Sequence, residues 1–161
     1  MWKKRNIRFL TEAAIIAAIY AAISTIFAPI SSGQVQVRIS EALTVLPVFT
    51  PAAIPGLFVG CVVANIISGN GPIDIVFGSL ATLVAAILSY KMPRRFLVPL
   101  PPVLINAVVV GFILTYVLKT PLIVNMGWVA LGQAIACYGL GYPLMLQLEK
   151  HKDKIFLTDK K

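Results

Sequence analysis

Long, nearly uninterrupted stretches of apolar residues constrain this chain more than any other feature of its sequence. Of its 161 residues, 58% are hydrophobic and only 12% are charged, and the mean hydropathy is +0.88. Soluble domains usually carry about twice that charged fraction. A water-soluble chain of this size cannot bury so much apolar surface, so the remainder must face lipid. The sequence therefore predicts a single, all-helical integral membrane domain.

Apolar length, together with the positions of Pro, Gly and charged residues, divides the chain into six predicted spans. They cover about residues 9–27, 39–49, 53–67, 73–90, 99–118 and 127–148, and residues 149–161 form a charged tail. The second and third spans are too short to cross about 30 Å of hydrocarbon as straight helices. Irregular backbone at membrane depth is tolerated only beside protein or water. The polar stretch 29–37 therefore indicates a pocket in a six-helix bundle.

The basic residues predict the orientation of these spans. Twelve of the 14 lie in three clusters that flank predicted spans: Lys3, Lys4, Arg5 and Arg8; Lys91, Arg94 and Arg95; Lys150, Lys152, Lys154, Lys160 and Lys161. Basic residues accumulate in the cytoplasmic loops of membrane proteins. With six crossings, both termini and the middle cluster are then cytoplasmic. This pattern also argues against nucleic-acid binding, and the long first apolar run argues against a cleavable signal peptide.

A ladder of alanines runs along the first predicted span. The four-residue spacing puts Ala13, Ala17 and Ala21 on one face, with Ala14, Ala18 and Ala22 beside them. Small residues at this spacing let helix backbones approach closely in a membrane. The ladder serves either packing within the bundle or docking of another membrane subunit. A second small pair, Gly56 and Gly60, is expected to serve internal packing.

Polar residues at membrane depth or in the outer loops are the candidate substrate-binding set. A charge in the middle of a membrane costs about 2.5–3.5 kcal/mol on insertion scales, so such groups normally face an interior and have a function. Gathered together, these side chains would form a small polar pocket that opens outward, with one cation and two carboxylates. The set is Arg38, Glu41, Asn65, Asp74, Asn106, Trp128 and Gln133.

Most of these residues also have a purely structural interpretation. Arg38 and Glu41, three residues apart, can form an ion pair on one helix face. Asp74 can cap the helix that follows the Gly-rich loop. Asn106 and Gln133 can make interhelical hydrogen bonds.

Two further residues have similar alternatives. Trp128 can belong to an interfacial aromatic belt or stack on a planar ligand. Glu12 follows Arg8 by four residues, which favours an exposed ion pair.

The chain lacks the motifs of common enzymes. It has no Gly-x-x-x-x-Gly-Lys-Ser/Thr loop, no His-Glu-x-x-His, no Gly-x-Ser-x-Gly and no metal-binding Cys/His spacing, and its single histidine lies in the tail. The chain therefore lacks the residues for phosphate binding by a P-loop, for metal-assisted hydrolysis and for Ser–His catalysis. We expect no enzymatic activity, no metal and no cofactor.

Three segments resemble the QueT family, whose members are substrate-binding S components of energy-coupling factor (ECF) transporters. They are Gly33–Pro47, Asn65–Asp74 and Phe77–Thr82. The resemblance implies a six-helix bundle in the bacterial plasma membrane with an outward-facing pocket, and residues 29–37 and 68–74 as a lid. It also implies that the alanine face docks on a transmembrane coupling subunit that works with two cytoplasmic ATPase subunits.

The expected cargo of that family is a queuosine precursor, a 7-deazaguanine such as 7-aminomethyl-7-deazaguanine. Glu41 and Asp74 would accept the guanine-like N–H edge and the aminomethyl cation, in an order left open, and Asn106 and Gln133 would read the carbonyl and ring nitrogens. Three alternatives remain: an S component for another vitamin-like compound, a proton-coupled secondary transporter that uses Glu41 or Asp74, and a structural subunit without a ligand.

Overall fold

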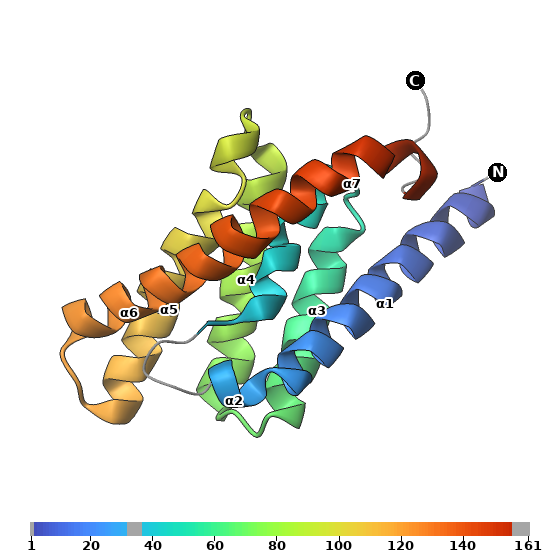
Figure 1. Cartoon of the computed structure of the whole chain (residues 1–161). Coiled ribbons are helices and arrows are strands. Elements are labelled where there is room, and N and C mark those ends of the chain that lie inside the picture. The colour runs from blue at the N-terminus through green and yellow to red at the C-terminus, as the bar shows by residue number, and fades with distance from the viewer. Residues whose placement is uncertain (1, 32–36, 156–161) are drawn as a thin grey trace.

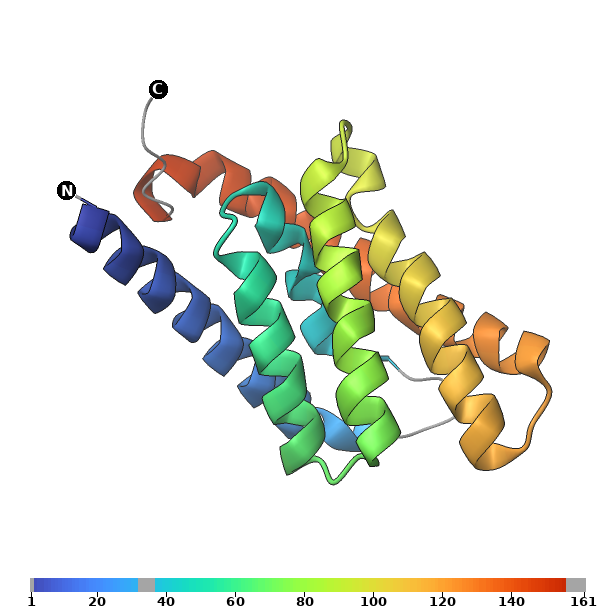
Figure 2. The same ribbon diagram turned by 180° about the vertical axis from the view of Figure 1, so that it is seen from behind.

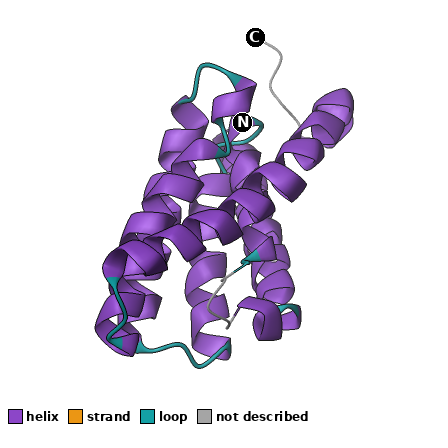
Figure 3. Ribbon diagram, turned by 60° about the vertical axis from the view of Figure 1, so that its left-hand side comes forward, coloured by secondary structure: helices purple, strands orange, loops and turns teal. Residues whose placement is uncertain are grey.

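The computed structural model describes residues 2–31 and 37–155 and contains only helices and loops within them (Figures 1 and 3). The all-helical class is therefore confirmed. The α-helices are α1 (Trp2–Ile26), α2 (Ala28–Ser31), α3 (Ala53–Ile67), α4 (Ser79–Lys91), α5 (Leu100–Leu118), α6 (Leu122–Ala134) and α7 (Tyr142–Ile155). Two 3₁₀ segments, η1 (Ile39–Val48) and η3 (Arg95–Leu97), and two π segments, η2 (Asp74–Gly78) and η4 (Ile135–Gly141), complete the fold.

Four helical stretches are long and apolar enough to cross a membrane. They are Asn6–Ile26, Asp74–Lys91, Arg95–Leu118 and Leu122–Lys152, whereas η1 and α3 are shorter. Many large apolar side chains on them are exposed, among them Phe112 at 57% and Ile123 at 84%. Such a surface suits lipid contact and not water. The chain is therefore a multi-pass membrane protein.

The connections alternate between the two ends of the bundle. Figures 1 and 2 show both termini and the α4–α5 connection at one end. The α3–α4 and α5–α6 connections lie at the other end, together with α2. Residues 32–36, which belong to the predicted lid at 29–37, lie outside the described residues.

The second predicted span, residues 39–49, is a 3₁₀ helix and not an α-helix. Helix η1 has ten residues, although 3₁₀ runs longer than three or four residues are uncommon. All residues from Ser40 to Pro47 are buried, and η1 contacts α1, α3, α4, α7 and η4. Figure 1 shows it in cyan among the longer helices. The surrounding protein explains how so short a segment is accommodated, because residues 40–47 are buried among other helices.

The last predicted span, residues 127–148, is too short at both ends. The helical run begins at Leu122, directly after Pro121, and continues through η4 into α7, which ends at Ile155. Part of the predicted tail is therefore helical. Glu149 forms an ion pair with Arg95, and the Glu and Lys residues of this segment favour helix. By contrast, α3 has the predicted bounds, and residues 156–161 lie outside the described part of the chain.

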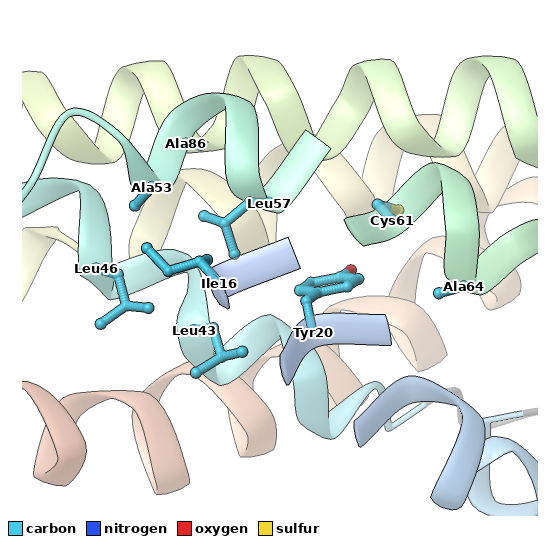
Figure 4. Packing of buried hydrophobic residues seen from close by; sticks show 9 residues of the cluster. All are labelled: Ile16, Tyr20, Leu43, Leu46, Ala53, Leu57, Cys61, Ala64 and Ala86. Atoms are coloured by element: carbon cyan, nitrogen blue, oxygen red, sulfur yellow. The ribbon is translucent and has the colours of Figure 1, made fainter. Parts of the chain in front are cut away.

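Helices α1 and α3 are in very close contact through small residues. A Cβ atom added at Gly56 would lie 2.7 Å from the carbonyl oxygen of Ala13, and one at Gly60 would lie 2.8 Å from that of Ala17. No side chain larger than hydrogen fits at that separation. The internal-packing interpretation of Gly56 and Gly60 is confirmed. The adjoining core includes Tyr20 and is drawn in Figure 4.

This contact divides the alanine ladder between two surfaces. Ala13 and Ala17 are half-buried against α3, and Ala21 is buried. The neighbouring stripe is exposed: Ala14, Ala18 and Ala22. Intramolecular packing therefore accounts for the first stripe, and only the second is free to meet another protein.

Candidate functional site

The carboxylate of Glu41 lies at the centre of the bundle and has no exposed surface. The Tyr20 hydroxyl and Thr82 Oγ1 donate hydrogen bonds to its Oε1, the latter over 3.2 Å. Asn106 Nδ2 donates to Oε2 over 3.1 Å. These four residues, which we call the carboxylate cluster, come from α1, η1, α4 and α5. All three donors are neutral, and among the described residues no cation is in ion-pair contact with this carboxylate; Arg38 interacts with it electrostatically at longer range.

Residues beneath Glu41 extend the cluster towards α6 and η4. The main-chain carbonyl of Glu41 accepts hydrogen bonds from Thr44 Oγ1 at 2.6 Å and from the Cys137 thiol at 3.6 Å. The same thiol reaches the side-chain oxygen of Gln133 at 3.7 Å. Gln133 is 1% exposed, as is Asn106. The structure therefore brings Glu41, Asn106 and Gln133 together in one buried polar region.

A second group of polar residues surrounds Asn65 near the end of α3. Asn65 Oδ1 accepts hydrogen bonds from Arg38 Nη2 at 2.6 Å and from Asn70 Nδ2 at 2.9 Å. Asn65 Nδ2 donates to the main-chain oxygen of Asp74 at 3.1 Å and lies 3.4 Å from Ser79 Oγ. We call these five residues the Asn65 cluster. It joins the residue before η1 to the α3–α4 loop and to the start of α4.

The two clusters meet at one thiol. Cys61 Sγ lies 3.5 Å from Thr82 Oγ1 and accepts a hydrogen bond from Asn65 Nδ2 at 3.6 Å. Cys61 is fully buried within the core shown in Figure 4. A continuous polar path therefore runs from Arg38 through Asn65, Cys61 and Thr82 to Glu41. The π segments η2 and η4 border this path, and π geometry occurs frequently at functional sites.

Asp74 is half-buried, and its carboxylate differs from that of Glu41. It accepts no hydrogen bond from the described residues, and η2 has no side-chain cap. Within the described chain, no side-chain hydrogen bond of Asp74 supports the helix-capping interpretation. The main-chain oxygen of Asp74 accepts the hydrogen bond from Asn65, and its carboxylate interacts electrostatically with Arg38.

The suggested local ion pairs are not formed in the described part of the chain. The one found there joins Arg95 and Glu149, and the Arg38 guanidinium contacts Asn65 instead of Glu41. Glu12 Oε2 accepts a hydrogen bond from Thr50 Oγ1 at 2.8 Å, which replaces the expected exposed pair with Arg8.

Trp128 is not brought to either cluster. Its side chain is 41% exposed on α6, and among the described residues no hydrogen bond or ring contact joins it to the polar path. Reasoning from the sequence also missed Tyr20 and Thr82 as partners of Glu41. Tyr20 lies seven residues after Ala13, on the same helix face, and that position could have marked it as an inward-pointing hydroxyl. For Thr82 the sequence holds no such signal.

The described residues contain no group of three or more His, Cys, Asp or Glu side chains that could hold a metal ion.

Comparison with known proteins gives one family. Residues 10–150 match the model of the QueT transporter family. A protein of Lactococcus lactis subsp. cremoris (strain MG1363), the "Queuosine precursor transporter QueT", is 26% identical over 167 residues, which cover 94% of this chain and 98% of that relative. No solved structure gives a significant match.

Proposed function

The chain belongs to the QueT transporter family, a family of transporters and not of enzymes, and on that premise we propose that it is the substrate-binding S component of an ECF importer for a queuosine precursor. The relative from Lactococcus lactis carries that precursor in its name and aligns along nearly its whole length. The observation that carries the proposal is the buried Glu41 carboxylate, which is held by three neutral donors.

An unpaired carboxylate is costly at this depth. Transferring a carboxylate from water into a protein interior costs roughly several kcal/mol. Hydrogen bonds from neutral donors offset only part of this desolvation cost. A cationic ligand group that reached Glu41 would offset more of that cost. The aminomethyl group of 7-aminomethyl-7-deazaguanine is such a cation. We therefore assign the ammonium end of the ligand to Glu41, with Asn106 and Gln133 beside it.

Arg38 and Asp74 suit the other end of the same ligand. A guanine-like edge has adjacent N–H donors that a carboxylate with two free oxygens accepts as a bidentate pair, and Asp74 has both oxygens free of described donors. The Arg38 guanidinium has further N–H groups besides the one on Asn65 and can donate to the ring carbonyl. Trp128, on the exposed side of α6, has no part in this assignment.

The exposed alanine stripe supports a docking role for α1. We propose that Ala14, Ala18 and Ala22 contact a transmembrane coupling subunit, which in turn acts with two cytoplasmic ATPases. The chain's lack of a phosphate-binding loop fits an energy source on other subunits. The basic clusters favour six crossings of the bacterial plasma membrane with both termini in the cytoplasm.

Docking is tested by Ala18→Leu, with Ala17→Leu as its matched control. Leu at the exposed position 18 is expected to abolish copurification with the coupling subunit while ligand affinity stays unchanged. Leu at position 17 would instead push α1 from α3, because the two backbones are so close that a Cβ added at Gly60 would lie 3.0 Å from Ala17 Cα. This variant is therefore expected to have a lower thermal midpoint. Normal copurification of Ala18→Leu would refute the docking face.

The cargo is tested by calorimetric titration of the purified protein with 7-aminomethyl-7-deazaguanine, guanine and queuine. Tight and selective binding of a deazaguanine is the expected result. Absence of binding to all three would withdraw the queuosine assignment and would leave family membership intact. Uptake that persists without any ATPase but requires a proton gradient would favour a secondary transporter instead.

A further inference from the structure

The hydrogen-bonding capacity of Asn65 is fully used by other protein groups. Its side chain is 0% exposed, its oxygen accepts from Arg38 and Asn70, and its nitrogen faces the Asp74 carbonyl, Ser79 and Cys61. An Asn amide has two acceptor lone pairs and two N–H donors. Two donors therefore occupy the oxygen, and three acceptors compete for two N–H groups. No capacity remains for a ligand.

The backbone at the end of α3 explains how Asn70 reaches Asn65. Gly69 has φ +68°, and its N–H donates to the Ile66 carbonyl at 3.2 Å. The Asn70 N–H donates to the Asn65 carbonyl at 3.0 Å. This pair of bonds around a left-handed glycine is the Schellman arrangement that ends many helices. It folds Asn70 back over the last turn, so that the Asn70 amide also meets the Asn65 side chain.

The partners of Asn65 are the groups that the proposed site needs in fixed positions. Arg38 would otherwise be a long side chain with many rotamers, and the bond to Asn65 restricts it. The bonds to the Asp74 carbonyl and Ser79 fix the first turns of the helix that carries the Asp74 carboxylate. Both charged residues thus depend on one neutral, buried amide.

We propose that Asn65 is a positioning residue, which holds Arg38 and the start of the η2–α4 helix in place and does not itself contact the transported ligand. This inference rests on the proposed function for its ligand. Its structural half does not, because the contacts of Asn65 exist without any cargo. The two halves can therefore be tested separately.

The structural half is tested by amide hydrogen exchange in the ligand-free, full-length protein. Asn65→Ala is expected to raise exchange in residues 70–78 and to leave the α5 peptides unchanged, because it removes the side-chain bonds and keeps the main-chain bond to Asn70. Asn65→Asp, which has the same size and keeps an acceptor for Arg38, replaces it if Asn65→Ala does not fold. Unchanged exchange in residues 70–78 would overturn the proposal.

The ligand half is tested by a double-mutant cycle with Arg38→Gln, titrated with 7-aminomethyl-7-deazaguanine. Asn65→Ala alone is expected to weaken affinity by about tenfold or more, because it removes the hydrogen bond that holds the charged Arg38 group. In the Arg38→Gln background the same change should weaken affinity clearly less than in the wild type, because the part of its effect that acts through Arg38 is already lost. Effects that multiply in full would show that none of the effect passes through Arg38, and would refute the positioning of Arg38 by Asn65.

If the wild-type protein binds none of the deazaguanines, the cargo assignment fails, and the exchange comparison alone then decides whether Asn65 positions Arg38 and η2. Ser79→Ala is a useful control in that comparison, because it removes only the longest of the Asn65–oxygen contacts, at 3.4 Å. It is expected to have a smaller effect than Asn65→Ala.

Discussion

The two polar clusters of this protein are built in opposite ways. The carboxylate cluster surrounds an acidic group with neutral donors. Its three contacts join residues that are separated in the sequence by 21, 41 and 65 positions. The Asn65 cluster surrounds a neutral amide, includes a cation, and uses several contacts only 5, 9 and 14 positions apart.

Under the proposed function, this difference separates ligand recognition from structural support. A buried carboxylate that has no cation in ion-pair contact is stabilised further when a cationic ligand group binds to it. An amide whose donors and acceptors are all hydrogen-bonded to protein groups gains nothing from a ligand, and it holds those groups in place. Substitutions in the carboxylate cluster should therefore change ligand affinity more than stability. Substitutions in the Asn65 cluster should instead act by shifting the positions of neighbouring residues.

The largest effect on affinity is expected from Glu41→Gln. The change keeps the size of the side chain and removes its charge, so binding of the aminomethyl ligand should weaken by about a hundredfold or more, as for other desolvated charge pairs. The thermal midpoint should hold or rise, because a buried charge is removed. Glu12→Gln, which alters an acid bonded to Thr50 outside the cluster, is the matched control and should leave affinity unchanged. Equal ligand affinities of Glu41→Gln and Glu12→Gln would contradict the proposed difference between the two clusters.

An intermediate effect is expected from Tyr20→Phe. It removes one hydroxyl donor to Glu41 and keeps the ring that fills the α1–α3 core. Affinity should fall by about fivefold and stability by about 1 kcal/mol, the usual value of one buried hydrogen bond. Calorimetry and thermal unfolding measure the two quantities. Tyr116→Phe, at a position 75% exposed, controls for loss of a hydroxyl and should change neither.

The smallest effect on affinity is expected from Gly69→Ala. Alanine at φ +68° costs about 1–2 kcal/mol of stability, because its Cβ crowds the following carbonyl. Affinity should change by less than about threefold, since the side chains of Asn65 and Arg38 remain. Gly71→Ala in the same loop, where an added Cβ meets nothing within 4 Å, should leave the thermal midpoint unchanged. An equal shift in both variants would argue against the Schellman arrangement.

The sequence is informative where local rules decide. Apolar length and proline positions predict α3 at 53–67, and four-residue spacing predicts that Gly56 and Gly60 pack internally. Apolar length does not predict a 3₁₀ helix at 39–48, because the enclosure of η1 by five other elements depends on the tertiary fold.

Only part of the candidate site can be predicted from the sequence in the same way. Buried polar residues such as Glu41 and Asn106 stand out against an apolar background. Their pairing does not, because these two residues, 65 positions apart, are brought together only by the packing of η1 against α4 and of α4 against α5. The sequence also cannot distinguish Asn65 from a ligand-binding amide, since that depends on how many partners the fold supplies.

The central claim is that the Glu41 carboxylate receives the cationic group of a deazaguanine. Titrating the wild-type protein and Glu41→Gln with 7-aminomethyl-7-deazaguanine and with 7-methyl-7-deazaguanine, which lacks the ammonium, tests it most directly. The account predicts that the wild type strongly prefers the aminomethyl ligand and that Glu41→Gln loses this preference. An undiminished preference in Glu41→Gln would place the ammonium elsewhere and contradict the account.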